Sequence, residues 1–339
     1  MKIAHIIPWI EPTGGCHIIY HHVLALRKLG HDVDVFAAGY HPQYLDNYEF
    51  KTLDGVFSSN TDINKVAELP DIDYNSYDLL VSNGLAGAIL SLDMPHPNKF
   101  WFIQNFDPWV FGENEEINRA YNGTENFFSY CSFLKTLIEN KYQLNKWVSC
   151  TNGIEYYRFL PFQKRRHKMQ RRIGFMTAYY GKLKGVKFAN EIFGELKKRG
   201  YTTVEVNAVG GPLPNTDEYY RNPSFQKKSQ LIADCDICIH PSLFETWGLA
   251  VSESMTLGTP VVCSDSIGIQ SFVNANGMFT NSIIVKNRDV NEFCDAIENL
   301  YYDMELYHRI QKNGINTMSK YAWMNVADSI VDSYKNMLR

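Results

Sequence analysis

Short apolar runs alternate with stretches of helical periodicity along most of the chain. Apolar runs of about four to eight residues bounded by turn residues are typical of buried strands, and apolar positions three and four apart are typical of one-sided helices. In the first half the pattern predicts strands over residues 3–7, 32–37, 78–82, 100–104, 127–129 and 147–150, with helices over 17–29 and 132–141. This alternation indicates βαβ units and a parallel sheet.

The same alternation starts again after an irregular stretch over residues 151–172. It predicts strands over 173–178, 203–209, 237–240 and 260–263, and helices over 186–199, 249–257, 290–302, 306–319 and 323–337. We therefore expect an α/β protein of two Rossmann-like domains facing across a cleft, one over 1–153 and the other over 154–322. The last helix, over about 323–339, is expected to pack back on the first domain. Ligands of such sheets bind outside the carboxyl ends of the strands.

Composition agrees with a folded protein. The 339 residues are 45% hydrophobic and 21% charged, and no apolar run reaches the roughly 18–20 residues that cross a bilayer. The first residues are typical of a strand rather than of a signal peptide, so we expect a cytoplasmic location. The seven scattered cysteines indicate reduced thiols, and Cys235-x-x-Cys238 has no second pair to complete a zinc site.

The two halves differ in charge. Residues 1–150 hold 18 acidic and 10 basic side chains, whereas the remaining residues hold 19 acidic and 23 basic ones. All ten charged residues between Arg158 and Lys187 are basic. An anionic ligand therefore belongs on the second half, although a solvated surface explains the cluster over 164–172 equally well.

The most informative segment follows the strand expected over 237–240. Glu245 and Gly248 lie in a loop, a helix is expected to start near Leu249, and Glu253 falls in its first turns. Free backbone N–H groups at a helix start favour a phosphate, and nearby carboxylates can accept hydrogen bonds from sugar hydroxyls. A capped surface helix with two solvated acids is the alternative interpretation.

This segment resembles the Glu-x7-Glu motif of the family 4 retaining glycosyltransferases, which have the GT-B fold. The family pattern is matched at Pro241, Ser242, Glu245, Gly248, Leu249, Glu253, Met255, Gly258, Pro260, Val261 and Val262, with Trp247 at its aromatic position. The resemblance implies that Glu253 binds the nucleotide ribose. It implies that Glu245 contacts the transferred sugar, and that the backbone of Trp247, Gly248 and Leu249 holds the diphosphate.

Weaker likenesses extend over much of the chain. Pro12-Thr13-Gly14-Gly15 resembles the family's Gly-Gly loop, where small residues let the backbone approach the donor diphosphate. Lys184-Gly185 matches a second donor motif, in which the usual Arg is replaced by Tyr179. We expect Lys182 to supply the second cation, as a point charge rather than a bidentate fork.

The strand expected over 100–104 leads into a polar segment. The residues Gln104-Asn105-Phe106-Asp107-Pro108 are similar to a stretch of rhamnan-type transferases, where many other members of the broad family carry a His. We therefore expect Asp107 to be catalytic, although a plain turn explains Asp-Pro equally well.

The resemblance implies a retaining hexosyl- or pentosyltransferase that moves a sugar from a nucleotide-diphosphate sugar to a hydroxyl of a glycan or related acceptor. By the resemblance no cofactor and no metal is needed, because lysines and backbone dipoles meet the diphosphate charge. His17 and His21 have a spacing that could hold a metal, but an ordinary helix face is the simpler interpretation. The chain lacks the Gly-rich signatures of nicotinamide dehydrogenases and P-loop enzymes.

Three alternatives remain open at this point. A DNA-modifying glycosyltransferase acting on hydroxymethylated bases would use the basic stretch on duplex phosphates, with nucleic acid as acceptor. A GT-B nucleotide-sugar epimerase and a non-enzymatic glycan-binding subunit are the other two.

Overall fold

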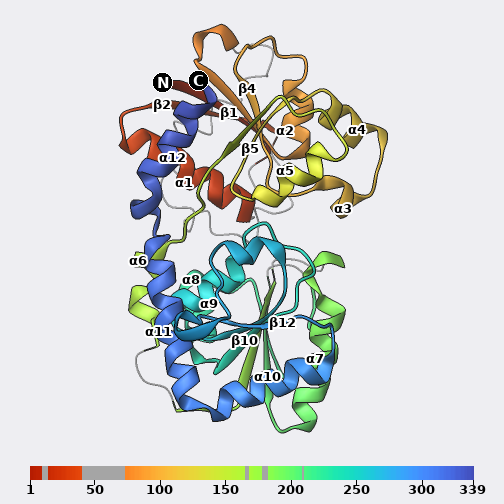
Figure 1. The fold of residues 1–339 in the computed structure, drawn as a ribbon, viewed down its shortest axis with the longest axis vertical. Coiled ribbons are helices and arrows are strands. Elements are labelled where there is room, and N and C mark those ends of the chain that lie inside the picture. The colour runs from red at the N-terminus through yellow and green to blue at the C-terminus, as the bar shows by residue number, and fades with distance from the viewer. Residues whose placement is uncertain (10–13, 40–72, 165–167, 178–181, 208–209) are drawn as a thin grey trace. The chain divides into compact units, whose positions relative to one another are not determined.

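The chain forms two compact α/β units in a computed structural model that describes residues 1–9, 14–39, 73–164, 168–177, 182–207 and 210–339 (Figure 1). Unit 1 consists of Met1–Gly153 together with Trp323–Arg339, and unit 2 consists of Ile154–Ala322. Each unit contains a six-stranded sheet in which all strand pairs are parallel.

The sheet of unit 1 has the order β2-β1-β3-β4-β5-β6. Its strands are β1 (Lys2–Trp9), β2 (Asp32–Gly39), β3 (Leu79–Asn83), β4 (Lys99–Phe102), β5 (Asn126–Ser129) and β6 (Lys146–Ser149). Its α-helices are α1 (Gly14–Lys28), α2 (Gly84–Ser91), α3 (Asp107–Phe111), α4 (Glu115–Asn122), α5 (Ser132–Glu139) and α12 (Trp323–Met337), and a 3-10 turn η4 covers Tyr74–Ser76.

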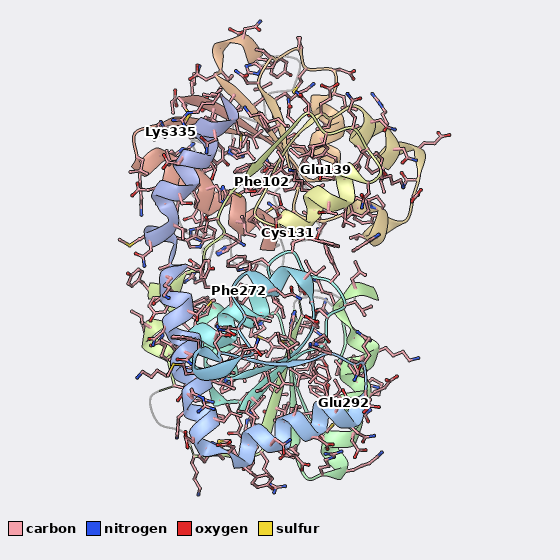
Figure 2. The ribbon with its side chains drawn as sticks, in the orientation of Figure 1. Phe102, Cys131, Glu139, Phe272, Glu292 and Lys335 are labelled. Atoms are coloured by element: carbon pink, nitrogen blue, oxygen red, sulfur yellow. The ribbon has the colours of Figure 1, made fainter. Side chains whose placement is uncertain are left out.

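The C-terminal helix α12 is part of the core of unit 1, where it packs against α1. Its buried side chains include Val326, Ile330 and Tyr334, spaced three to four apart as a one-sided helix requires. The Tyr334 hydroxyl lies 3.1 Å from Nε2 of the buried His5 of β1. Figure 2 shows Phe102 within unit 1 and Lys335 of α12 on its surface.

The sheet of unit 2 has the order β12-β11-β10-β7-β8-β9. Its strands are β7 (Arg172–Thr177), β8 (Thr202–Asn207), β9 (Glu218–Arg221), β10 (Ile237–His240), β11 (Val261–Ser264) and β12 (Ile283–Val285). Its α-helices are α6 (Tyr156–Phe159), α7 (Val186–Lys198), α8 (Phe225–Asp234), α9 (Leu249–Leu257), α10 (Val290–Tyr302) and α11 (Met304–Lys320). Its 3-10 turns are η5 (Leu160–Phe162), η6 (Lys182–Lys184), η7 (Ile267–Ser271) and η8 (Gly277–Phe279).

The strand order of unit 2 is that of a doubly wound Rossmann sheet. From β7 the chain proceeds outward through β8 and β9, and it then returns to add β10, β11 and β12 on the other side. The direction reverses between β7 and β10, and the carboxyl ends of strands at such a reversal are the usual ligand site of open α/β sheets. The loops that follow β7 and β10 are the segments in which the sequence places Lys184 and Glu245.

The fold class predicted from the sequence is confirmed, with differences in individual elements. Helices α9, α10 and α12 have the predicted bounds, whereas β4 ends at Phe102 and α5 ends at Glu139, earlier than expected. Seven further helices and strands, α2, α3, α4, α6, α8, β9 and β12, were not predicted. The strand ends expected at residues 178 and 208–209 lie outside the described residues. Among the described helices, none combines the length and apolarity of a membrane crossing.

Candidate active site

The start of α9 is built around Gly248. This residue is the N-cap of the helix and has a φ of 88°, a left-handed conformation that glycine adopts without strain. A Cβ at this position would lie 2.6 Å from Cγ2 of Ile269, so a larger residue would collide with its surroundings. Gly248 has no side chain that could cap the helix, and Leu249 and Ala250 are partly exposed. The first N–H groups of α9 therefore remain available to an anion.

Glu245 and Lys184 form an ion pair at the carboxyl ends of β7 and β10. Nζ of Lys184 lies 2.9 Å from both carboxylate oxygens, and Glu245 is only 7% exposed. Nε2 of His240, the last residue of β10, lies 3.2 Å from Oε1 of Glu245. Burial alone would raise the pKa of Glu245, but the Lys184 ammonium and the His240 ring lower it to about 2. The carboxylate is therefore charged at any ordinary pH.

The two loops that carry this pair are locked together by their backbones. Leu243 N–H donates to the carbonyl of Leu183 over 2.8 Å. Gly185, which has a φ of 67°, lies so close to Pro241 that a Cβ would stand 2.0 Å from the Pro241 carbonyl oxygen. The Lys-Gly pair found in the sequence thus has a physical reason, because only glycine lets the Lys184 loop reach the Glu245 loop.

Glu253 lies in α9 and forms an ion pair with α8. Its Oε1 is 2.7 Å from Nζ of Lys228, and its side chain is 18% exposed.

Trp247, which was predicted to contribute its backbone, has a buried indole 4.8 Å from the ring of Phe272, centroid to centroid. Phe272 is marked within unit 2 in Figure 2. The Trp247 side chain therefore anchors the loop in the core and leaves its backbone at the helix start.

The predicted site residues of unit 1 lie at the first residues of two helices, α1 and α3. Gly14 and Gly15 begin α1, and Nε2 of Gln104 donates to the Gly15 carbonyl over 3.3 Å. Asp107 begins α3, where its Oδ2 accepts a hydrogen bond of 2.9 Å from the Tyr121 hydroxyl. Burial raises the pKa of Asp107 to about 6, against the lowering effect of that hydrogen bond. The Asp-Pro step starts a helix rather than an isolated turn.

Three of the predicted positions lie wholly or partly outside the described residues. They are Pro12-Thr13 of the Gly-Gly loop, the Tyr179 position, and the side chain of Lys182, whose backbone belongs to η6.

Several groups that could be taken for metal ligands have other contacts. Asp-x-Asp sequences occur at 32–34, 71–73 and 234–236. Of these, the carboxylate of Asp34 accepts from the Tyr77 hydroxyl. The carboxylate of Asp236 accepts from the backbone N–H groups of Gln170 and Arg172, and residues 71–72 are not among those described. His21 stacks on the indole of Trp323, 4.5 Å away.

His240 was not predicted from the sequence to belong to the site. The strand 237–240 was recognised, but its last residue was not assigned to the site. The rule that ligand sites lie at the carboxyl ends of strands would have found it, since His240 directly precedes the Pro241-Ser242 motif.

Comparison with known proteins gives a family match within the second unit. Residues 170–303 match the family model described as "Glycosyl transferases group 1". Alpha-D-kanosaminyltransferase of Streptomyces kanamyceticus is 24% identical over 196 residues, which are 52% of this chain and 50% of that protein. D-inositol 3-phosphate glycosyltransferase of Stackebrandtia nassauensis is 24% identical over 111 residues, 33% of this chain and 24% of that protein. The matches thus span half or less of these curated relatives.

Solved structures match nearly the whole chain. Sucrose-phosphate synthase from Thermosynechococcus elongatus aligns with a TM-score of 0.74 and 14% identity, covering 99% of both chains. Anabaena HepE in complex with UDP and glucose aligns with a TM-score of 0.73 and 17% identity, also covering 99% of both chains. At these identities the likeness establishes the fold. The chain thus has the GT-B fold of these glycosyltransferases, and its residues 170–303 match the group 1 glycosyltransferase model.

Proposed function

We propose that the chain is a retaining glycosyltransferase that transfers a sugar from a nucleotide-diphosphate sugar to a hydroxyl of a glycan or related acceptor. The observation that carries this proposal is the ion pair of Lys184 with the buried Glu245 in unit 2, at the strand reversal. The pair shares one short loop with the uncapped start of α9. A cation, a helix N-terminus and a carboxylate are the groups that a sugar diphosphate requires.

Each part of the donor has a counterpart in unit 2. The N–H groups after Gly248 and the ammonium of Lys184 stabilise the diphosphate, with Lys182 as a second cation. Glu253 accepts hydrogen bonds from the ribose hydroxyls, and Glu245 accepts hydrogen bonds from the hydroxyls of the transferred sugar. The UDP and glucose in the HepE complex support a donor of this class.

The reaction needs no protein nucleophile. The bond between the anomeric carbon and the phosphate oxygen breaks, and the acceptor oxygen bonds to the same face of that carbon. The acceptor proton passes to the leaving phosphate oxygen, and the charge that develops on the diphosphate is met by Lys184 and the start of α9. Asp107 in unit 1, with a pKa of about 6, is ionised at neutral pH and accepts a hydrogen bond from a second hydroxyl of the acceptor, which orients it.

The donor is found first with a panel of nucleotide sugars. A ligand at about 100 times its dissociation constant stabilises a protein by about 2.7 kcal/mol, which a thermal-shift assay detects. Transfer is then measured with that donor and candidate glycan acceptors. An absence of both stabilisation and turnover across the panel would overturn the proposal.

The decisive variant is Glu245→Gln, which keeps the shape of the side chain and removes its charge. We expect turnover to fall more than tenfold, while affinity for the free nucleoside diphosphate stays nearly intact because that ligand lacks the sugar. Glu218→Gln is the matched control. Glu218 also pairs with a cation, Arg172, over 3.1 Å, but both residues lie at the first positions of their strands, at the opposite edge of the sheet.

Turnover by the control should equal that of the unmodified protein. If Glu245→Gln also turns over normally, Glu245 has no role in the active site. If Glu245→Gln only lowers the melting temperature, the residue merely supports the start of the helix.

A further inference from the structure

We propose that His240 is a positioning residue that holds the Glu245 carboxylate in place once Lys184 has turned to the donor diphosphate, an inference that rests on the proposed function. The two side chains beside Glu245, Lys184 and His240, differ in flexibility, and we assign them different roles for that reason. Lys184 holds its ammonium at the end of a long flexible chain, on the turn η6. His240 belongs to a strand and has a short, rigid side chain.

The backbone of His240 is held by the pairing of its strand. His240 lies opposite Cys263 of β11, and the preceding residue, Ile239, lies opposite Phe175 of β7. The side chain is 5% exposed, so its rotamers are limited by packing. The imidazole is therefore a stationary partner, 3.2 Å from Oε1 of Glu245.

The hydrogen-bonding state of the ring follows from its partner. Both ring nitrogens of His240 are buried and make no well-aligned hydrogen bond within the described residues, although Nε2 lies 3.2 Å from Oε1 of Glu245. An ionised carboxylate can only accept, so a hydrogen bond between the two groups forms when Nε2 carries the proton. A core histidine kept for stability normally has its buried nitrogens paired. The arrangement is therefore explained better by the carboxylate that His240 faces than by the packing of the strand.

In this proposal, donor binding changes the contacts that Glu245 makes with Lys184 and His240. Lys184 has a single ammonium, and contact with the diphosphate draws it away from Glu245. The carboxylate, 7% exposed, then remains in a poorly solvated place, with the His240 ring still 3.2 Å from its Oε1. Without that ring the carboxylate would follow the ammonium to the phosphate or turn toward solvent, and it would no longer face the sugar.

The test compares two substitutions that differ in reach. Gln places an amide nitrogen near the position of Nε2 and can still donate to Glu245, whereas the shorter Asn cannot. We expect His240→Asn to lower kcat at least tenfold and to change the affinity for free nucleoside diphosphate less than twofold. We expect His240→Gln to recover kcat to within about threefold of the unmodified protein. The melting temperature of both variants is measured alongside.

The outcomes separate this inference from the proposal beneath it. Normal turnover by His240→Asn would overturn the role of His240 and leave the proposed function standing. Equal losses of kcat in both variants, accompanied by a lower melting temperature, would also overturn it, because they indicate a packing role. A failure of the unmodified protein to bind or use any nucleotide sugar would overturn the proposed function, and this inference with it.

Discussion

Replacement of Lys184 by Met tests the electrostatics of the donor-free site. The substitution keeps most of the apolar side chain but removes the ammonium that lies 2.9 Å from both oxygens of Glu245. A buried carboxylate then remains without its cation. Leaving one member of a buried pair unpartnered is strongly destabilising.

The magnitude follows from the pKa of Glu245, which the site lowers from 4.5 to about 2. Each pKa unit corresponds to about 1.36 kcal/mol, so the folded site stabilises the charged form by on the order of 3 kcal/mol. Because the folded pKa lies below the unfolded value, this stabilisation is present above about pH 4.5 and is lost as the pH falls toward 2. We expect Lys184→Met to destabilise unit 2 by a similar amount at pH 7.

The assay is urea or thermal unfolding without ligand, repeated between pH 7 and pH 2. A loss of about 3 kcal/mol lowers the melting temperature by about 6–12 °C for a unit of this size. The double variant Lys184→Met/Glu245→Gln should recover much of the loss, because it removes the unpartnered charge as well. A loss below about 1 kcal/mol, or a double variant no more stable than Lys184→Met, would refute the reasoning.

Three further predictions concern binding and turnover. Glu253→Ala should weaken donor binding at least about tenfold by calorimetry, because one charge-assisted hydrogen bond contributes about 1.5–3 kcal/mol; unchanged affinity in the folded variant would remove the ribose assignment. Turnover should fall as the pH drops through about 6, where Asp107 takes up a proton, and Asp107→Asn should abolish that step; a step that persists belongs to another group. Turnover should survive excess EDTA, and a loss that magnesium or manganese restores would contradict metal independence.

Local patterns in the sequence predicted much of the architecture because their causes are local. The helix over 249–257 could be placed because Gly248 and Gly258 flank it, and Gly258 has the left-handed φ that is typical after a helix C-terminus. By contrast, β9 has the sequence Glu-Tyr-Tyr-Arg and β12 has only three residues. Both are edge strands, defined mainly by pairing with a neighbour, so neither shows a clear pattern in the chain.

Contacts between distant segments could not be predicted from the sequence. Lys184 and Glu245 were each assigned to the donor, but nothing in the chain shows that they bind one another without it. The ion pair of Glu253 with Lys228 joins α9 to a helix that was not predicted. His240 is the last residue of a short apolar strand. A single polar residue there forms no sequence pattern that would assign it to a site. Its role becomes visible only when β10 is placed beside β7.

Because α12 belongs to unit 1 but follows unit 2 in the sequence, unit 1 is the later of the two units to be fully synthesised. As the chain leaves the ribosome, every residue of unit 2 is available before the last helix of unit 1 has been made. Until then His21 and His22 of α1 lack the Trp323 and Tyr334 side chains that they contact in the finished fold. A premature stop codon near residue 323 would therefore spare the second half of the protein and damage the first. Such a nascent or truncated chain would depend on chaperones to shield that helix.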